Sequence, residues 1–207
     1  MTNAPANRGQ AIRHRIPSIC AVMVAPTSLD PSPTFVASGN PADVLRAAAE
    51  HLVVCERAAR PHEMCDALLL LAHCWRAEGD LGQAEAHLEQ ALRWSRLLGS
   101  ADAVVDMLCE LAETATLAAE TLEHQAAGSG YAARERARAR ARAHTQEAAQ
   151  LAAQVADPRW EIQVLLRVSE VLSRCGDRSE AALLQSRAMR LMAWEVTAPM
   201  GVGVEPG

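Results

Sequence analysis

The chain has 207 residues, with 20 basic and 25 acidic side chains and a formal net charge of −5. All of the basic residues are arginine, which excludes Schiff-base and P-loop lysine chemistry. Half of the residues are hydrophobic but only 3% are aromatic. Because strong helix formers fill the middle of the chain and β-branched runs are missing there, an all-α fold is predicted.

Both ends of the chain differ from its middle. Proline, glycine and small polar residues without any period predict a disordered leader over residues 1–40 and a disordered tail over 196–207. The helical domain is therefore expected at 41–195. Arginines before the apolar stretch Ile16–Ala25 imitate an export signal, but the stretch is short and contains Pro17. Whether Met1 or Met23 starts the protein stays open.

Location is predicted from the cysteines and from hydropathy. The six cysteines form no C-x-x-C pair, which favours buried thiols in a reducing, cytoplasmic compartment. No stretch approaches the roughly 20 apolar residues of a membrane span, so no membrane association is predicted. Frequent Ala and Arg without Lys suggest a GC-rich bacterial genome.

Helix-starting and helix-ending residues divide the domain into about seven helices. Asparagine or aspartate before proline is typical of a helix start, and glycine is typical of a helix end. The expected starts are Asn40-Pro41, Pro61 and Asp157-Pro158, the expected ends are Gly79-Asp80, Gly99-Ser100 and Gly176-Asp177, and Gly128-Ser129-Gly130 is a corner. Short turns between the helices predict a stack of antiparallel helix hairpins.

Two segments of the chain align with each other, Leu68–Leu92 and Leu165–Met189. Small residues recur where two helices would approach closely: Ala72, Gly79, Ala84 and Ala91 in one, and Ser169, Gly176, Ala181 and Ala188 in the other. This pattern resembles the tetratricopeptide repeat (TPR) family, in its longer-repeat bacterial form. A degenerate copy with Leu108, Ala112, Ala141, Thr145 and Ala148 lies between them, and residues 42–60 look like a half-repeat cap.

The resemblance implies an α-solenoid of about three hairpins whose first helices line a binding groove. The implied lining residues are Asp66, Leu69, His73 and Arg76, then Asp106, Cys109, Glu113 and Thr116, then Gln163, Leu166, Glu170, Ser173 and Arg174. Four carboxylates against two arginines predict a basic or neutral peptide as the partner. The Lys and Asn clamp of chaperone-binding TPR proteins is absent. The resemblance thus implies a non-catalytic adaptor or regulatory subunit.

The run RERARARARA, residues 134–143, raises the question of nucleic-acid binding. On a helix its arginines spread around the axis instead of forming one face. The preceding helix contains only acidic charges, and antiparallel folding is expected to bring Glu123 near Arg134 and Glu120 near Arg138. Because the chain is acidic and aromatic side chains are few, no nucleic-acid partner is predicted.

Other site chemistries receive less support. His51, Cys55, His62 and Cys65 have zinc-like spacing, with His51 and Cys55 on one helix face, but packing of these side chains between helices is the simpler interpretation. No nucleophile elbow or glycine-rich cradle is present, so no enzyme activity and no cofactor are predicted. A ligand-sensing regulator and a metal-dependent or hydrolytic enzyme remain alternatives.

The last predicted helix carries an apolar edge. Met189, Met192 and Trp194 lie at its end, beyond the last repeat. Because the outer face of a terminal repeat has no neighbouring repeat, this edge could favour a homodimer or docking of a partner.

Overall fold

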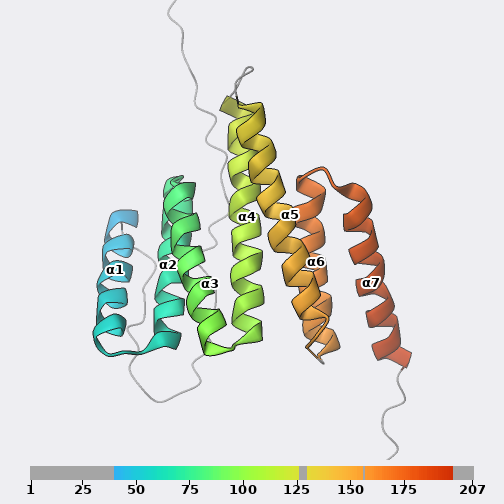
Figure 1. Ribbon diagram of the computed structural model, residues 1–207, viewed down its shortest axis with the longest axis horizontal. Coiled ribbons are helices and arrows are strands. Elements are labelled where there is room, and N and C mark those ends of the chain that lie inside the picture. The colour runs from blue at the N-terminus through green and yellow to red at the C-terminus, as the bar shows by residue number, and fades with distance from the viewer. Residues whose placement is uncertain (1–39, 126–129, 156, 198–207) are drawn as a thin grey trace, which may run out of the picture. The chain divides into compact units, whose positions relative to one another are not determined.

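The computed structural model describes residues 40–125, 130–155 and 157–197 (Figure 1), and within these ranges it contains seven α-helices and no strand. The all-α prediction is therefore confirmed. The helices are α1 (Pro41–Arg57), α2 (Pro61–Glu78), α3 (Leu81–Leu98), α4 (Ala101–Gln125), α5 (Tyr131–Ala152), α6 (Pro158–Arg174) and α7 (Arg178–Thr197). Helix α7 ends two residues beyond the predicted boundary at 195. The predicted disordered ends, 1–39 and 198–207, lie outside the described residues, as do positions 128 and 129 of the predicted corner.

The predicted helix ends are confirmed in their local geometry. Gly79, Gly99 and Gly176 follow helices with φ of 85°, 70° and 91°, the left-handed conformation that favours glycine. The Asp80 carboxylate caps α3 by accepting from the Gln83 backbone N–H at 3.0 Å. The Asp157 carboxylate caps α6 in the same way, accepting from two backbone N–H groups at 3.0 and 3.3 Å.

Two glycines on either side of the α2–α3 turn should respond oppositely to alanine. A Cβ at Gly79 would meet nothing within 4 Å, so Gly79→Ala carries only the cost of its positive φ, about 1 kcal/mol of lost stability. Gly82 lies inside α3 with ordinary backbone angles, and its Cβ would contact the Asp80 carboxylate at an ordinary 3.5 Å. Gly82→Ala should therefore stabilise the protein by about 0.5 kcal/mol. Urea unfolding of both variants checks the prediction, and equal effects would contradict it.

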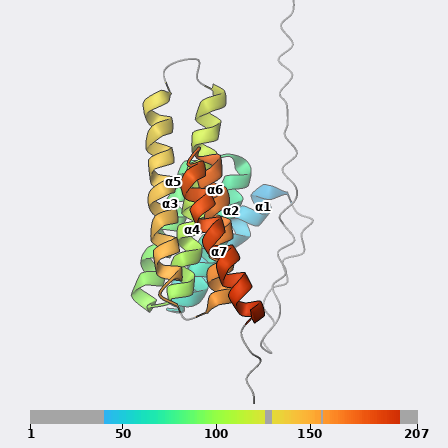
Figure 2. The same ribbon diagram turned by 90° about the vertical axis from the view of Figure 1, so that its right-hand side faces the viewer.

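The helices pack as hairpins in chain order. Helix α2 packs most extensively on α3, α4 on α5, and α6 on α7, while contacts between consecutive hairpins are less extensive. Helix α1 packs on α2, and α4 also contacts α6 directly. Helices α2, α4 and α6 thus share one layer, and α3 and α5 lie on the other side (Figures 1 and 2). This is a helical-repeat arrangement.

The core contains small residues where the repeat alignment placed them. Ala72, Ala84, Ala91, Ser169, Ala181 and Ala188 are all at most 1% exposed. Leu68, Leu108 and Leu165, from the first helix of each hairpin, are fully buried. Small side chains at these contacts allow the helix axes to approach closely, and the leucines fill the space between them.

The outer face of α7 is apolar and exposed. Met189, Met192 and Trp194 are 66%, 38% and 61% exposed. The predicted apolar edge is therefore present, and a homodimer through it stays a prediction. Within the described ranges, no helix is both long enough and apolar enough to cross a lipid bilayer.

Candidate functional site

An ion-pair network joins the three first helices, α2, α4 and α6. Glu110 of α4 is its centre. One carboxylate oxygen lies 2.9 Å from His73 Nε2 and 2.8 Å from Arg76 Nη2, both on α2. The other oxygen accepts from Arg167 Nη2 of α6 at 2.5 Å. One acidic side chain therefore connects consecutive hairpins on the face where the sequence predicted the binding groove.

Glu113, one turn further along α4, completes the network. It accepts from Arg167 Nε at 2.6 Å and lies 3.9 Å from Arg76 Nη1. Arg167 thus contacts two carboxylates with two different nitrogens, and each contact is a charge-assisted hydrogen bond. The arrangement holds α4 and α6 in register.

The electrostatics of the network follow from its partial burial. Desolvation raises the pKa of Glu110, whose side chain is only 12% exposed, but the hydrogen bond from His73 and the charges of Arg76, His73 and Arg167 outweigh it. Its pKa falls to about 2. Desolvation lowers the pKa of Arg167, yet its hydrogen bond and charge interaction with Glu113, with the charge of Glu110, raise it above the ordinary value. Glu110 and Arg167 therefore both stay charged at neutral pH.

The predicted lining residues fall into three groups. His73, Arg76 and Glu113 belong to the ion-pair network, and Arg174 pairs with Glu120 at 2.8 Å. Leu69 is half-buried and packs against the core. The exposed members are Asp66, Asp106, Gln163, Leu166, Glu170 and Ser173.

Two predicted lining residues are wrong as contact residues because the structure buries them. Thr116 is 1% exposed, donates to the Ala112 carbonyl at 2.9 Å and contacts Cys175 Sγ at 3.4 Å. Cys109 is 2% exposed, and desolvation raises the pKa of its thiol to about 12. Both side chains pack between helices of the hairpin stack, where a partner cannot reach them.

The sequence reasoning did not place Glu110, Arg167 or Glu120 on the binding face. A signal was present, because Glu110 and Arg167 occupy the same place in the second and third copies of the repeat and have opposite charge. Equivalent positions of neighbouring repeats lie side by side in a solenoid. Comparing charges between aligned copies would have predicted this pair.

Four of the five arginines in the run on α5 pair with carboxylates of the protein, partly as expected. Arg134 lies 3.7 Å from Glu123, as predicted. The predicted Glu120–Arg138 pair is wrong, because Glu120 pairs with Arg174 and Arg138 pairs with Glu123 at 3.4 Å and Glu135 at 3.1 Å. Two further arginines of the run reach carboxylates outside α4 and α5: Arg140 pairs with Glu85 and Arg142 with Asp177, each at 2.8 Å.

The four residues with zinc-like spacing do not come together as one group. Cys65 points into the core, where Ser95 Oγ lies 3.7 Å from its sulfur, while His62 is exposed. His51 and Cys55 do share a face of α1, with 3.6 Å between Nε2 and Sγ. Glu63 of α2 joins them.

No family model matches the chain, and no curated protein matches its sequence. Among solved structures the chain is similar to BtubC (BKLC) from P. vanneervenii. That similarity has 15% sequence identity and a TM-score of 0.46, and it covers 84% of this chain and 70% of that one. The description of the fold is therefore based on the observed helices, and the proposed function is based on the geometry of the site.

Proposed function

We propose that this protein is a non-catalytic interaction module of TPR-like type, an adaptor or regulatory subunit that binds a basic or neutral segment of a partner protein. The proposed binding surface is the exposed face of α2, α4 and α6. One observation carries the proposal: the arginines on this face are engaged by carboxylates, whereas three exposed carboxylates are not.

The charges of this face support a basic partner. Arg76 and Arg167 are held by Glu110 and Glu113, and Arg174 is held by Glu120. Among the described residues, no ion pair within 4.0 Å joins the exposed carboxylates to a basic group; these carboxylates are Asp66, Asp106 and Glu170. The surface thus offers negative charge that the fold itself does not neutralise.

Apolar and polar contacts on α6 complement these charges. Leu166 is 42% exposed, and Gln163, Leu166, Glu170 and Ser173 follow the spacing that places residues on one side of a helix. Such a strip suits an extended or helical segment that presents an apolar side chain beside a basic one. The same reasoning favours a protein partner over nucleic acid, because four of the five arginines in the run on α5 already pair with carboxylates.

A cytoplasmic location fits this proposal. Cys55, Cys65, Cys109 and Cys175 are buried thiols without a disulfide. Buried free thiols are typical of proteins in reducing compartments.

Peptide selection tests the proposed surface. A displayed library of random peptides, panned on the full chain, should enrich sequences with arginine or lysine next to an apolar residue. Selected peptides should lose roughly tenfold in affinity for the double variant Asp106→Asn, Glu170→Gln, since each charge contact contributes roughly 1 kcal/mol or less. Fluorescence anisotropy measures the loss.

The matched control removes the same charge elsewhere. Glu50→Gln with Glu89→Gln changes two exposed carboxylates on α1 and α3, and it should leave the affinity unchanged. Enrichment of acidic peptides, or equal losses in both double variants, would contradict the proposed surface.

Ligand sensing is a second candidate, and a cavity favours it. This cavity of about 450 Å³ is lined by Thr145, Gln146, Ala149, Gln150, Ala153 and Gln154 of the α5 region, Leu172 of α6, and Glu180, Leu184 and Arg187 of α7. Its lining combines apolar and polar side chains, the mixture of groups that small-molecule sites use. If the selected peptides bind the Asp106→Asn, Glu170→Gln variant with unchanged affinity but bind a Gln150→Arg variant more weakly, this cavity is the binding site instead of the face of α2, α4 and α6.

A further inference from the structure

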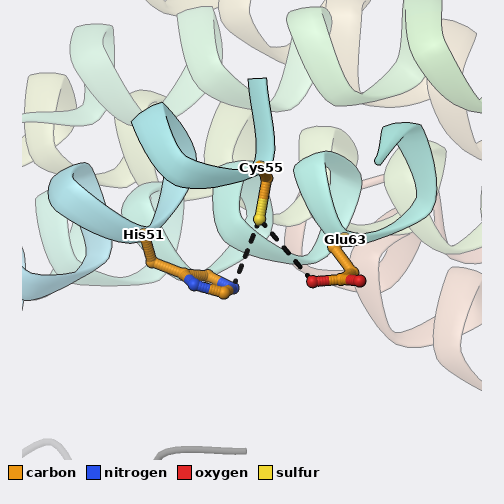
Figure 3. Close-up of side chains that lie close together, drawn as sticks. All are labelled: His51, Cys55 and Glu63. Atoms are coloured by element: carbon orange, nitrogen blue, oxygen red, sulfur yellow. Dashed lines mark hydrogen bonds between the residues drawn. The ribbon is translucent and has the colours of Figure 1, made fainter. Parts of the chain in front are cut away.

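A cluster of three metal-ligating side chains lies where α1 meets α2, apart from the surface described above. Cys55 Sγ is 3.6 Å from His51 Nε2 and 3.8 Å from a carboxylate oxygen of Glu63 (Figure 3). The nitrogen, sulfur and oxygen atoms all lie within 4.8 Å of one another. Figure 3 shows the imidazole and the carboxylate side by side below the sulfur, each pointing towards it.

These spacings fit one side of a tetrahedron around zinc. Zinc lies about 2.3 Å from a thiolate sulfur and about 2.0–2.1 Å from imidazole nitrogen or carboxylate oxygen. With tetrahedral angles, the sulfur is then about 3.5–3.6 Å from each of the other two ligand atoms. The observed 3.6 and 3.8 Å are close to this separation.

Local sequence explains how the three side chains meet. His51 and Cys55 are one helical turn apart on α1, so both face α2. Glu63 lies in the first turn of α2, after a short connection in which Ala59 has a φ of 51°. Non-glycine residues rarely adopt this conformation. The tight reversal brings the first turn of α2 against the last turns of α1.

The cluster combines burial of the sulfur with access from solvent. Cys55 is 0% exposed, whereas His51 and Glu63 are half-buried. An ion can therefore approach between the imidazole and the carboxylate and reach the sulfur beneath them. Partial exclusion of water around a thiolate strengthens its attraction for a cation.

We propose that His51 Nε2, Cys55 Sγ and the Glu63 carboxylate together bind one zinc ion. A thiolate and a carboxylate neutralise the two positive charges of zinc, and the imidazole is a neutral third ligand. Sulfur and nitrogen ligands in tetrahedral spacing favour zinc over magnesium or calcium, which require six or more oxygen ligands. The fourth position is open to water. Binding releases the thiol proton to solvent.

Arg60 and Asp66 are charged neighbours of this cluster. Without metal, Glu63 pairs with Arg60 at 2.8 Å, and zinc must compete with this exposed ion pair, which contributes little. Asp66, one turn after Glu63 on α2, feels the charges of Glu63, His62 and His51.

Metal titration of the full chain tests the proposal. Chelator-treated protein, kept reduced, should bind one equivalent of Zn²⁺ by calorimetry. Co²⁺, used as a spectroscopic substitute, should give a thiolate-to-cobalt charge-transfer band and the strong visible absorption of a tetrahedral complex. Cys55→Ser should abolish the charge-transfer band, and His51→Ala and Glu63→Gln should each weaken Zn²⁺ binding at least tenfold.

Matched controls separate this site from ordinary surface binding. Cys74→Ser and His87→Asn change a half-buried cysteine and a half-buried histidine outside the cluster, and both should bind Zn²⁺ as the unchanged protein does. No one-to-one binding, binding that survives Cys55→Ser, or equal weakening in the controls would each overturn the proposal. Because Glu63 is only half-buried, Glu63→Gln should fold even if a change at buried Cys55 does not, and circular dichroism verifies folding.

Discussion

Replacing Glu110 with alanine is expected to lower the free energy of unfolding by about 3 kcal/mol at neutral pH. The Glu110 carboxylate is 12% exposed and accepts from groups on both neighbouring first helices. Its removal leaves Arg76 and Arg167, which are 20% and 34% exposed, facing each other with only Glu113 between them. Two partly buried positive charges that share a single carboxylate are costly, because one of them lacks a full partner. Urea unfolding measures the loss.

The pH dependence of this effect gives a signature of the Glu110 charge. Its pKa falls from 4.5 in the unfolded chain to about 2 in the folded protein, which corresponds to about 3 kcal/mol. Since the folded pKa is the lower one, this stability is present above pH 4.5 and is lost as pH falls towards 2. The difference between the unchanged protein and Glu110→Ala should therefore narrow below pH 4.5.

Glu170→Ala is the control for Glu110→Ala. Glu170 is an exposed carboxylate on the same face, and its replacement should change stability by no more than about 0.5 kcal/mol. Equal losses in the two variants, or a Glu110→Ala effect that stays constant down to pH 3, would contradict the central role of the buried carboxylate.

Replacing Ala84 with leucine is expected to destabilise the protein by about 2–3 kcal/mol. Ala84 is 0% exposed in the contact between α3 and the adjacent helices, where it packs in the same core cluster as Ala72 and Leu88. Three additional carbon atoms cannot fit without moving α3 away from α2. Thermal and urea unfolding both report the change.

Ala86→Leu provides the matched control because Ala86 lies on the exposed side of the same helix. Both substitutions change the intrinsic helix propensity by the same amount, so any difference in stability between the two variants comes from packing. A stable Ala84→Leu variant would show that the small residues of the repeat do not set the distance between helices.

Local sequence signals predicted the helices because they act over a few residues. Gly79, Gly99 and Gly176 end helices, since the left-handed conformation after a helix suits glycine and needs no tertiary contact. The aspartates before α3 and α6 cap their own backbone N–H groups. The small residues at Ala84 and Ala181 predicted the hairpins because close packing excludes larger side chains at those positions.

The candidate sites could not be predicted in the same way, because they depend on distances between helices that are far apart in the sequence. Charge pairing was predicted within one hairpin, yet Glu120 pairs with Arg174, in the next hairpin. A long arginine side chain can reach several carboxylates, and only the helix packing decides which one is nearest. In the same way His51 and Cys55 were placed together by helical spacing, but Glu63 was added by the angle of the turn before α2.

The sequence by itself determined the helix boundaries, the pairing into hairpins and which small residues are buried. These properties follow from backbone preferences and side-chain volume, which each residue carries with it. The tertiary structure decided that Thr116 and Cys109 are buried and that Glu110 connects three helices. Those outcomes depend on the rotation of each helix about its axis, because a small rotation moves a side chain from solvent into the core.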